Sequence, residues 1–299
     1  MLGHGIAEGS TPGLVRPLRD DDLPRLTDLV RGLLPWMVIT ERGLAHMRSS
    51  TGWWVADHEG EILGTGRSGR FGRIWVGVAR GSRNNGIGTA LLARVEAEAR
   101  EAGWTEATAW SDDDIGASFA ARHGYHAARE KPVSVLELGD ASLPPLEPPA
   151  GVELRPLVLL DDRLHELHEL AMAAHRDDPA DGSDAEQSFE EWLRDDIGVP
   201  DLDFSGSVVA LVDGRLAALA LVTTDNAERA ENEFTGTHPD FRGRGLGTLV
   251  KLSTLHWARG CGIRSILTGN DAENAPMLAI NRKLGYRQVG LRRKHVRAL

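Results

Sequence analysis

Three short motifs occur twice along the chain, and they occur in the same order each time. The first is an Arg-Pro-Leu tripeptide, at residues 16–18 and 155–157. The second is a glycine-bearing segment that begins at Arg83 and again at Arg242, and the third is a Gly-Tyr pair at Gly124 and Gly285. One repeated tripeptide arises easily by chance, but three in the same order indicate an internal duplication and hence two copies of one fold. The motif separations place about twenty extra residues in the second copy, before its glycine-bearing segment.

Each glycine-bearing segment lies between a run of β-type residues and an amphipathic helix. In such a loop the glycines let the backbone approach a ligand, several N–H groups point into one concavity, and the helix N-terminus contributes a partial positive charge. The segments are therefore predicted to hold a phosphate group. Their R-x-x-G-x-G spacing lacks the Lys-Ser/Thr pair of the P-loop and differs from G-x-G-x-x-G, so a nucleoside triphosphatase and a dinucleotide-binding protein are both disfavoured.

The spacing resembles the pyrophosphate-binding signature of the GNAT acyltransferases, R/Q-x-x-G-x-G/A. Pro239 lies three residues before Arg242, where many family members have a proline, whereas the first copy has Arg80 there. The resemblance implies acetyl-CoA as cosubstrate. In the second copy it implies the cofactor-binding residues Thr235, Gly236, Thr237, Arg242, Gly243, Arg244, Gly245, Leu246, Gly247 and Thr248. In the first copy the matching residues, which either bind coenzyme A as well or only preserve the turn, are Val78, Arg83, Asn84, Asn85, Gly86, Ile87, Gly88 and Thr89.

Hydrophobic periodicity and turn residues predict the same order of elements in both halves. In the first half the expected strands cover residues 14–18, 53–57, 62–67, 74–79, 105–110 and 132–138, and the expected helices cover 20–34, 87 to Gly103, and 115–122. In the second half the expected strands cover 152–157, 208–212, 216–222, 230–237, 265–268 and 287 onward, and the expected helices cover 161–175, 188–195, 246–258 and 275–284. A strand, helices, three strands, a helix, a strand, a helix and a strand is the element order of the GNAT family.

We therefore predict an α/β fold class with two tandem GNAT-like domains, each a mostly antiparallel twisted sheet flanked by helices. The predicted domains are residues 1–138 and 152–299. A stiff linker at 139–151 joins them, because this stretch contains two Pro-Pro pairs. The tandem layout resembles that of the mycothiol synthases, although a layout does not fix a substrate.

Composition narrows the cellular context of the 299-residue chain. A formal net charge of −10 disfavours binding to nucleic acid or to anionic membranes. The single cysteine, Cys261, excludes an internal disulfide and is typical of a reducing cytoplasm; between two glycines it is expected to be small and structural. Residues 1–10 lack a secretory signal pattern, and the most apolar run, 207–222, is interrupted by charges. We expect a cytoplasmic protein, monomeric or homodimeric, with no nucleic-acid or membrane partner.

An amine must lose a proton before it attacks a thioester, because a free ammonium has a pKa of about 10. A nearby carboxylate can take that proton. In the second copy Glu231 lies eleven residues before Arg242, which matches the catalytic glutamate of histone-acetyltransferase-type GNAT members, and Glu233 follows two residues later. At least one of them is predicted to be the base; the alternative is a solvated strand face. The first copy has Gly72 and Ile74 at these positions, so catalysis is expected in the second copy.

Other family positions agree only in part. Many GNAT enzymes have a tyrosine, four residues before the glycine of the last motif, that protonates the leaving thiolate. Here those positions hold Asn281 and Ala120, so the usual general acid is absent. Asn274 falls where many members bind pantetheine, and Asn270, Asn274 and Asn281 are predicted to contact the cofactor; capping of the following helix by Asn270 or Asp271 is compatible with this role.

An acidic stretch, 177–191, coincides with the extra residues of the second copy. In GNAT folds this region shapes the acceptor site, so Asp177, Asp178 and Asp181 are predicted to contact a cationic acceptor such as an aminoglycoside or polyamine. The alternative is a solvated acidic loop. No metal site is expected: His165 and His168 are spaced i, i+3 and lack a third ligand, and the spacing around Gly182 fails the calcium-loop pattern.

The sequence thus predicts an N-acetyltransferase that moves an acetyl group from acetyl-CoA to a primary amine of a small molecule by direct attack in a ternary complex. The first domain is expected to be degenerate or structural. The alternatives are acetylation of a protein or peptide amine and a non-catalytic acyl-CoA-binding module, which the missing tyrosine would suit.

Overall fold

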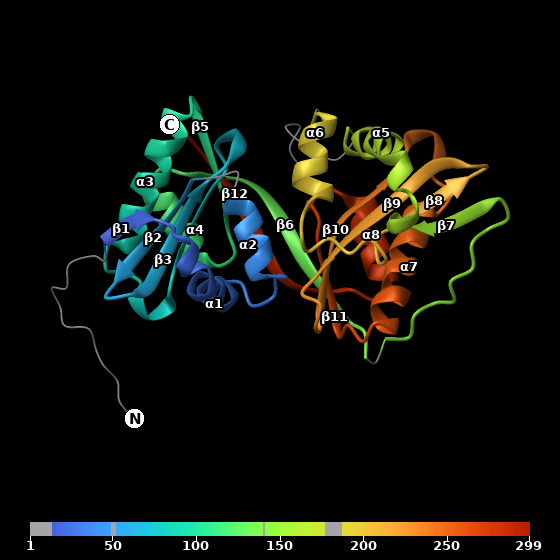
Figure 1. Ribbon diagram of the computed structural model, residues 1–299, viewed down its shortest axis with the longest axis horizontal. Helices are drawn as coiled ribbons and strands as arrows, with labels where there is room; N and C mark the ends of the chain where they lie inside the picture. The colour runs from blue at the N-terminus through green and yellow to red at the C-terminus, as the bar shows by residue number, and fades with distance from the viewer. Residues whose placement is uncertain (1–13, 49–51, 140, 177–186) are drawn as a thin grey trace.

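The computed structural model describes residues 14–48, 52–139, 141–176 and 187–299. Two α/β bodies lie side by side, the first built mainly from the first half of the chain and the second from the second half (Figure 1). Two long strands, β6 (His126–Glu137) and β12 (Arg287–Ala298), run from one body into the other. In the part of the chain that the structure describes, no helix is both long and apolar enough to cross a bilayer.

The first body contains a four-stranded antiparallel sheet in the order β1-β2-β3-β4. Its strands are β1 (Leu14–Pro17), β2 (Gly52–His58), β3 (Glu61–Ser68) and β4 (Ile74–Val78), and its helices are α1 (Leu23–Leu33), α2 (Glu41–Arg48), α3 (Ile87–Glu101) and α4 (Asp114–Arg122). Helix α3 buries Ile87, Leu91 and Val95 against the sheet, as their i, i+4 spacing predicts. Helix α2 is absent from the sequence prediction, although Thr40 caps it by accepting from the Gly43 N–H at 2.9 Å, a detectable N-cap signal.

The remaining strands form one eight-stranded sheet in the order β5-β12-β6-β11-β10-β9-β8-β7. It contains β5 (Glu106–Ser111), β7 (Val152–Pro156), β8 (Val208–Val212), β9 (Arg215–Thr224), β10 (Arg229–Thr237) and β11 (Ser265–Gly269). The helices of the second body are α5 (Leu164–His175), α6 (Phe189–Trp192), α7 (Leu246–Gly260) and α8 (Ala275–Lys283), with a π-helical turn at Leu193–Ile197 after α6. Its core includes Leu167, Trp192, Leu219, Leu255 and Ile266, all almost fully buried.

The two halves exchange their last strands. The end of β6, residues 133–137, pairs antiparallel with β11 of the second half, and the end of β12, residues 293–298, pairs with β5 of the first half. Strands β6 and β12 also pair with each other along most of their length. The division of the chain at 139–151 remains a prediction, and the strand hydrogen bonds join the two sides of it into one sheet.

The parallel strands β10 and β11 separate part-way along, which opens the sheet. They pair only from Arg229–Asn232 with Ser265–Thr268, and the rest of β10 runs on beside β9 alone. A register shift between Asn232 and Phe234 marks a β-bulge at Glu233. Bulges commonly re-aim a side chain beside a functional site. In the first half the split is wider: β4 and β5 lie in different sheets, joined by a single bridge between Arg73 and Thr108.

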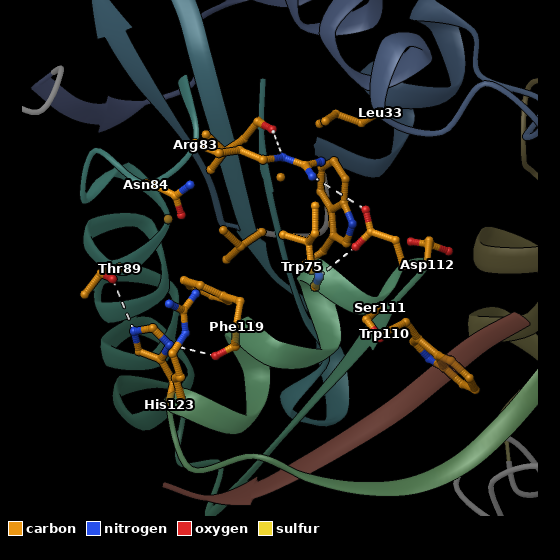
Figure 2. Close-up of a pocket in the computed structure, with 18 of the residues that line it drawn as sticks. Leu33, Trp75, Arg83, Asn84, Thr89, Trp110, Ser111, Asp112, Phe119 and His123 are labelled. Atoms are coloured by element: carbon orange, nitrogen blue, oxygen red, sulfur yellow. Dashed lines mark hydrogen bonds and ion pairs between the residues drawn. The ribbon is translucent and has the colours of Figure 1, made fainter. Parts of the chain in front are cut away.

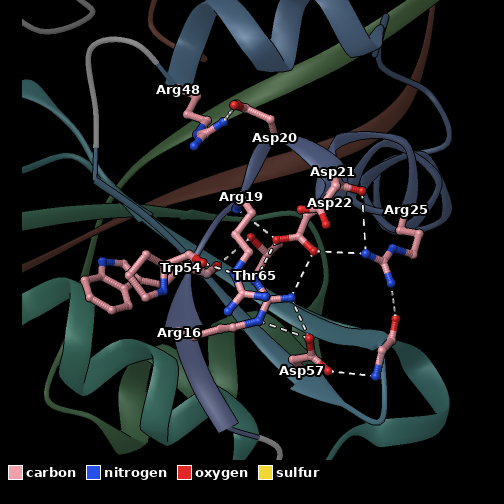
Figure 3. A network of polar contacts seen from close by, with 12 residues as sticks. Arg16, Arg19, Asp20, Asp21, Asp22, Arg25, Arg48, Trp54, Asp57 and Thr65 are labelled. Atoms are coloured by element: carbon pink, nitrogen blue, oxygen red, sulfur yellow. Dashed lines mark hydrogen bonds and ion pairs between the residues drawn. The ribbon is translucent and has the colours of Figure 1, made fainter.

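A buried ionic network holds the start of the first body together (Figure 3). The guanidinium of Arg16 donates to the Asp22 carboxylate at 2.6 and 2.9 Å and to Asp57 at 2.5 and 3.0 Å. The Asp22 side chain is almost fully buried and also accepts from the backbone N–H of Arg19 at 2.8 Å. Arg16 and these bonds lower the pKa of Asp22 to about 2. The equivalent Arg155 of the second body instead pairs with the exposed Glu153.

Contacts from α2 and the segment before it join the two bodies. The buried carboxylate of Asp201 accepts from the Thr40 hydroxyl at 2.6 and 2.7 Å and from Arg42 Nε at 2.6 Å. Gly43 makes this approach possible, because an added Cβ would lie 2.3 Å from Asp201 Oδ2. Arg229 donates to the backbone oxygen of Pro35 at 2.7 Å. These contacts place the first body over the open edge of β10.

Candidate functional site

The glycine loop of the second body forms an exposed turn at the start of a long helix. Residues Arg242 to Gly245 are exposed, and Leu246 anchors the fifteen-residue helix α7 in the core. Gly243 and Gly245 have φ of 75° and 77°, which L side chains rarely adopt, so glycine is required for this shape. Arg242 Nε donates to the Thr237 backbone oxygen at 3.2 Å and closes the loop onto β10. Backbone N–H groups at a helix start of this kind can bind an anion such as a pyrophosphate.

The loop of the first body has a similar backbone conformation and the same arginine hydrogen bond. Arg83 Nε donates to the Val78 backbone oxygen at 3.3 Å, and Asn84 and Gly86 have φ of 65° and 80°. Helix α3 then begins at Ile87, as α7 begins at Leu246. The sequence motif therefore encodes the same backbone twice, including the left-handed residues. Its remaining predicted members, Asn85, Gly88 and Thr89, lie in the same turn and the start of the helix.

The two predicted carboxylates lie where β10 leaves β11. Glu231 is the third residue of β10, opposite Thr223 of β9 and Leu267 of β11. Its side chain is half-buried, and the backbone N–H of Val38, from the first body, hydrogen-bonds to its carboxylate. Glu233 lies on the bulge and accepts from the Thr223 hydroxyl at 2.9 Å. The Glu233 side chain is exposed to solvent and lines a cavity.

Both carboxylates hold a proton more tightly than an ordinary glutamate. Burial raises the pKa of Glu231 to about 8, and the charge of Glu233 adds to this. Burial also raises the pKa of Glu233, while the Thr223 hydroxyl and the positive charges of Lys131 and Arg292 oppose the rise. Perturbed carboxylates in a cavity are a common feature of acid–base sites. Glu231 is half-buried and Glu233 is exposed to solvent, so the base role remains a prediction.

The cavity beside Glu233 has a volume of about 480 Å³ and lies between the two bodies. From the second body it is lined by Glu233, Phe234, Thr235, Asn270, Asn274 and Met277. From the first body it is lined by apolar and aromatic side chains that include Trp53, Trp75 and Trp110. Its volume falls in the range of small-ligand sites. Glu231 is not among the lining residues, so Glu233 is the carboxylate that faces this space.

Four further predicted residues support the site or border it. Gly236 allows α5 to pack on β10, since an added Cβ would lie 2.6 Å from Ala174 Cβ. Thr237 lies between the two halves of the loop: its backbone oxygen accepts from Arg242, and its hydroxyl is 3.2 Å from where a Cβ on Gly247 would lie. Thr248 and Arg244 continue the loop into α7, where Arg244 stacks 5.3 Å from the Phe241 ring.

Two of the three asparagines line the cavity, and the third is buried behind them. Asn274 Oδ1 accepts from the Met277 N–H at 3.1 Å, so Asn274 is the N-cap of α8, where the sequence had suggested Asn270 or Asp271. Asn281 is buried and donates from Nδ2 to Asn270 Oδ1 at 2.6 Å. Asn270 and Asn274 line the cavity, whereas Asn281 lies behind them and orients Asn270.

Neither tyrosine of the chain is available to protonate a thiolate. The Tyr286 hydroxyl is buried and donates to Asn232 Oδ1 at 2.8 Å, and the Tyr125 hydroxyl donates to Glu96 Oε1 at 2.8 Å. Burial raises the pKa of both phenols far above neutrality. The absence of the family's tyrosine at Asn281 and Ala120 is therefore not compensated by either tyrosine.

A second cavity, of about 620 Å³, lies beside the glycine loop of the first body (Figure 2). It is lined by Val78, Arg83, Asn84, Gly86, Gly88 and Thr89, and on the far side by Phe119 and His123 of α4. Thr89 Oγ1 and His123 Nε2 are 3.2 Å apart, and His123 Nδ1 contacts the Phe119 backbone oxygen at 2.9 Å. The two cavities share Leu34, Trp75 and Trp110 in their walls.

This second cavity has no counterpart of the glutamate pair. Gly72 has φ of 66°, and an added Cβ would lie 2.0 Å from the Glu106 backbone oxygen, so the position does not accept a side chain. Ile74 is buried in the core of the first body. The first body therefore keeps the loop but not a base on β4.

Two groups of residues differ between the sequence analysis and the structure: predicted residues that the structure does not describe, and lining residues that were not predicted. The predicted substrate residues Asp177, Asp178 and Asp181 lie outside the described residues. Conversely, the sequence analysis missed four basic residues that line the interdomain cavity, namely Arg67, Arg73, Lys131 and Arg292. Lys131 and Arg292 lie on the exchanged strands β6 and β12, and no local motif marks them.

Comparisons with known proteins assign both bodies to one family. The sequence model described as "Acetyltransferase (GNAT) family" matches residues 164–286, and the one described as "Acetyltransferase (GNAT) domain" matches residues 49–127. Similar curated relatives include mycothiol acetyltransferases. That of Pseudarthrobacter chlorophenolicus is 28% identical over 228 residues, which cover 73% of this chain and 67% of the relative; that of Nocardia farcinica is 29% identical over 253 residues, which cover 78% of each.

Solved structures agree on the fold. A tandem GNAT protein from the clavulanic acid biosynthesis pathway superposes with a TM-score of 0.74 at 23% identity, covering 95% of this chain and 98% of the other. A GCN5-related N-acetyltransferase from Sphaerobacter thermophilus gives a TM-score of 0.68 at 18% identity, covering 95% of each chain. At these identities the likeness concerns the fold, and it confirms the predicted fold class. The chain belongs to the GNAT acetyltransferase family as a tandem member with two GNAT domains, and it is an acyltransferase.

Proposed function

We propose that the protein transfers an acetyl group from acetyl-CoA to a primary amine of a small molecule, and that the second domain carries out the reaction. The single observation that supports this most is the position of Glu233. It lies on the β10 bulge, where β10 separates from β11, and it faces a cavity of about 480 Å³. The glycine loop that follows β10 has the shape of a pyrophosphate site. The loop would hold the pyrophosphate of acetyl-CoA, the opening beside β10 would hold the rest of the molecule, and Glu233 would lie beside the acceptor amine.

Acetyl-CoA supplies the thioester that is attacked, and the chain's own groups would hold it. The N–H groups of residues 243–247 fit the pyrophosphate, because the loop is exposed and two of its residues adopt the left-handed conformation. The open edge of β10 beyond Asn232 leaves backbone groups for an extended amide chain such as pantetheine. A backbone N–H of this edge is the donor we assign to the negative charge that develops on the carbonyl oxygen.

Glu233 is the proposed general base. It takes a proton from the ammonium of the acceptor; the amine nitrogen then forms the new bond to the carbonyl carbon as the carbon–sulfur bond breaks. The nitrogen loses its second proton to solvent or to the departing sulfur as the amide forms, and the coenzyme A thiolate leaves without a tyrosine acid. That thiolate is a fair leaving group, since thiols of this kind have a pKa near 8.5. Glu231 is assigned a tuning role, because its own proton limits the charge beside Glu233.

The cavity of the first domain favours a second, non-catalytic role. Its loop has the geometry of the second domain's loop, and its volume of about 620 Å³ suits a large ligand, but β4 offers no base. We propose that this domain retains an acyl-CoA ligand without turning it over, and that it closes the acceptor cavity of the second domain through Val38 and Asp201's partners Thr40 and Arg42.

The test is release of coenzyme A thiol from acetyl-CoA with a panel of primary amines, with mass spectrometry of the products. Amide formation that is lost in Glu233→Gln, while acetyl-CoA still binds, is the expected result. Thiol release without an acetylated amine, or turnover that is insensitive to Glu233→Gln, would contradict the proposal.

A further inference from the structure

The acceptor cavity has a basic wall, and this wall is not explained by the transfer reaction. Arg67 on β3, Arg73 just before β4, Lys131 on β6 and Arg292 on β12 all line it. Of the four, Arg292 lies 2.8 Å from Asp112, so its charge is balanced within the protein. The cavity's other lining carboxylate besides Glu233 is Asp271, which Arg129 holds at 3.2 Å.

Arg67 is the group that most needs a further partner. Its side chain is largely enclosed: the guanidinium lies 5.7 Å from the centre of the Trp53 ring and Nη1 is 3.3 Å from Met47 Sδ. Among the residues that the structure describes, no carboxylate pairs with Arg67. Burial lowers its pKa, and the like charge of Arg73 lowers it further, so the site opposes the charge that Arg67 must carry. An enclosed guanidinium has five N–H donors, and a thioether is a poor acceptor for them.

Stacking on tryptophan does not by itself explain this burial. Arg94 on α3 stacks on the neighbouring Trp54 at 4.0 Å, and there the guanidinium also lies 3.7 Å from Glu101, outside both cavities. Both arginines lie over a tryptophan ring, Arg94 more closely; of the two, Arg67 lines a ligand cavity and has no acidic partner among the described residues. Arg94 provides a matched reference for Arg67.

We infer that the cavity binds an anionic group at Arg67, and that the acceptor is therefore a primary amine that also carries a carboxylate or phosphate. The inference rests on the proposed function, in which the acceptor's amine lies beside Glu233. Glu233 lines the cavity from the second domain, and Arg67 lines the same cavity from the first. A guanidinium forms two parallel bonds with either anion. Such an acceptor would bridge the domains, with its ammonium at the carboxylates and its anion at the basic wall.

The apolar walls set a second property of this acceptor. Besides Arg67 and Glu233, the cavity is lined by the apolar side chains of Met37, Ile39, Leu44, Trp53 and Trp75. An apolar or aromatic body on the carbon chain that carries the amine and the anion would remove these surfaces from water. An amino acid with an aromatic side chain carries all three groups, and a compact phosphorylated amine carries the amine and a phosphate; both serve as probes.

The experiment compares matched amines with acetyl-CoA: L-phenylalanine against 2-phenylethylamine, and O-phosphoethanolamine against ethanolamine. A charge-assisted pair of hydrogen bonds predicts a kcat/KM about 10- to 100-fold higher for an anionic member. The pair with the larger ratio of kcat/KM between its anionic and neutral members shows whether the site prefers a carboxylate or a phosphate. In Arg67→Met this preference should fall to near one, Arg67→Lys should retain part of it, and Arg94→Met should keep it in full. Equal or better turnover of the neutral amines by the unaltered protein would overturn the inference.

A binding measurement separates this inference from the proposed reaction. Phenylacetate and inorganic phosphate are titrated against the intact protein, with tryptophan fluorescence as the readout because Trp53, Trp75 and Trp110 line the cavity. Saturable binding that weakens about 10- to 100-fold in Arg67→Met, but not in Arg94→Met, supports the anion site even if no amine is acetylated. Turnover of neutral amines without any anion binding would leave the reaction standing and refute the anion site.

Discussion

Replacing Glu233 by glutamine should produce a rate loss that depends on pH. At pH 7 only about one in a thousand molecules of an amine with a pKa near 10 is neutral, so a base that removes the proton in the complex can contribute up to about 10³. General bases typically contribute about 10²–10⁴. We therefore expect Glu233→Gln to lower kcat by about 10²–10³ at pH 7.

The loss should shrink as pH rises, because the amine then arrives already neutral. Each pH unit removes about a tenfold part of the advantage, which leaves a deficit of about tenfold near pH 9. In the unaltered protein the rate should also fall at low pH, as Glu233 is protonated at its raised pKa. That acid limb should disappear in Glu233→Gln.

The assay is thiol release from acetyl-CoA between pH 6 and 9.5, with the same saturating amine for every variant, so that all variants are compared with an acceptor of the same pKa. Glu231→Gln is the matched control, two residues away on the same strand. It should lose less than about tenfold and should lack the step near pH 8 that reports the Glu231 proton. A deficit in Glu233→Gln that is the same at every pH, or a larger deficit in Glu231→Gln, would refute the assignment of the base.

Four further substitutions test the framework around the site. Asp22→Asn removes the carboxylate buried against Arg16 and should lower the free energy of unfolding at pH 7, measured with denaturant, by about 3–5 kcal/mol. The folded pKa of Asp22 is lowered to about 2, so the stabilisation by its carboxylate is complete above about pH 4 and is lost as the pH falls to about 2. This pH dependence should be absent in the variant. Asp201→Asn and Gly43→Ala should each raise the KM for the amine more than the Kd for acetyl-CoA, since both break the contact that closes the cavity; equal effects on the two ligands would argue against that role. Lys251 is fully buried and its pKa is lowered to about 7, so between pH 7 and about 10.5 the unfolded chain binds more protons than the folded one and stability rises with pH. Lys251→Met should raise the free energy of unfolding at pH 7 by about 1–4 kcal/mol and flatten this rise. An unchanged dependence of the unfolding free energy on pH, measured thermally or with denaturant, would contradict this.

The sequence predicts the parts of this structure that local chemistry determines. The left-handed residues of the loops require glycine or asparagine, so Asn84, Gly86, Gly243 and Gly245 mark the turns directly. The helices after them follow from regular apolar spacing. The opening of the sheet beside Glu233 depends on where β10 leaves β11 and on the register shift at that residue, neither of which a local motif marks.

The strand exchange is not visible in the sequence, because its strands carry many charges. Residues 126–131 are polar and read as a loop, yet they pair with the equally charged β12, where Glu130 and Arg293 balance each other across the ladder at 3.4 Å. Strand patterns report burial, and these segments are buried only in part.

The basic wall of the cavity was missed for a related reason. Its members come from β3, the start of β4, β6 and β12, and only the packing of two domains brings them together. The acidic stretch around Asp177 drew attention to positive charge on the acceptor. The anion site inferred at Arg67 adds a negative charge to that acceptor, so an acceptor with both charges would fit the expectation and the inference together.

The central claim is that the second domain catalyses the transfer, and one comparison of two variants tests it most directly. Gly245→Glu and Gly86→Glu place the same carboxylate in the equivalent position of each loop, at φ of 77° and 80°, where an added Cβ meets no neighbouring atom. Acetyl-CoA binding by calorimetry and amine acetylation are measured on both. We expect Gly245→Glu to abolish acetylation and Gly86→Glu to retain most of it, with each variant losing only its own binding site. Loss of acetylation in Gly86→Glu with activity preserved in Gly245→Glu would contradict the account and place the chemistry in the first domain.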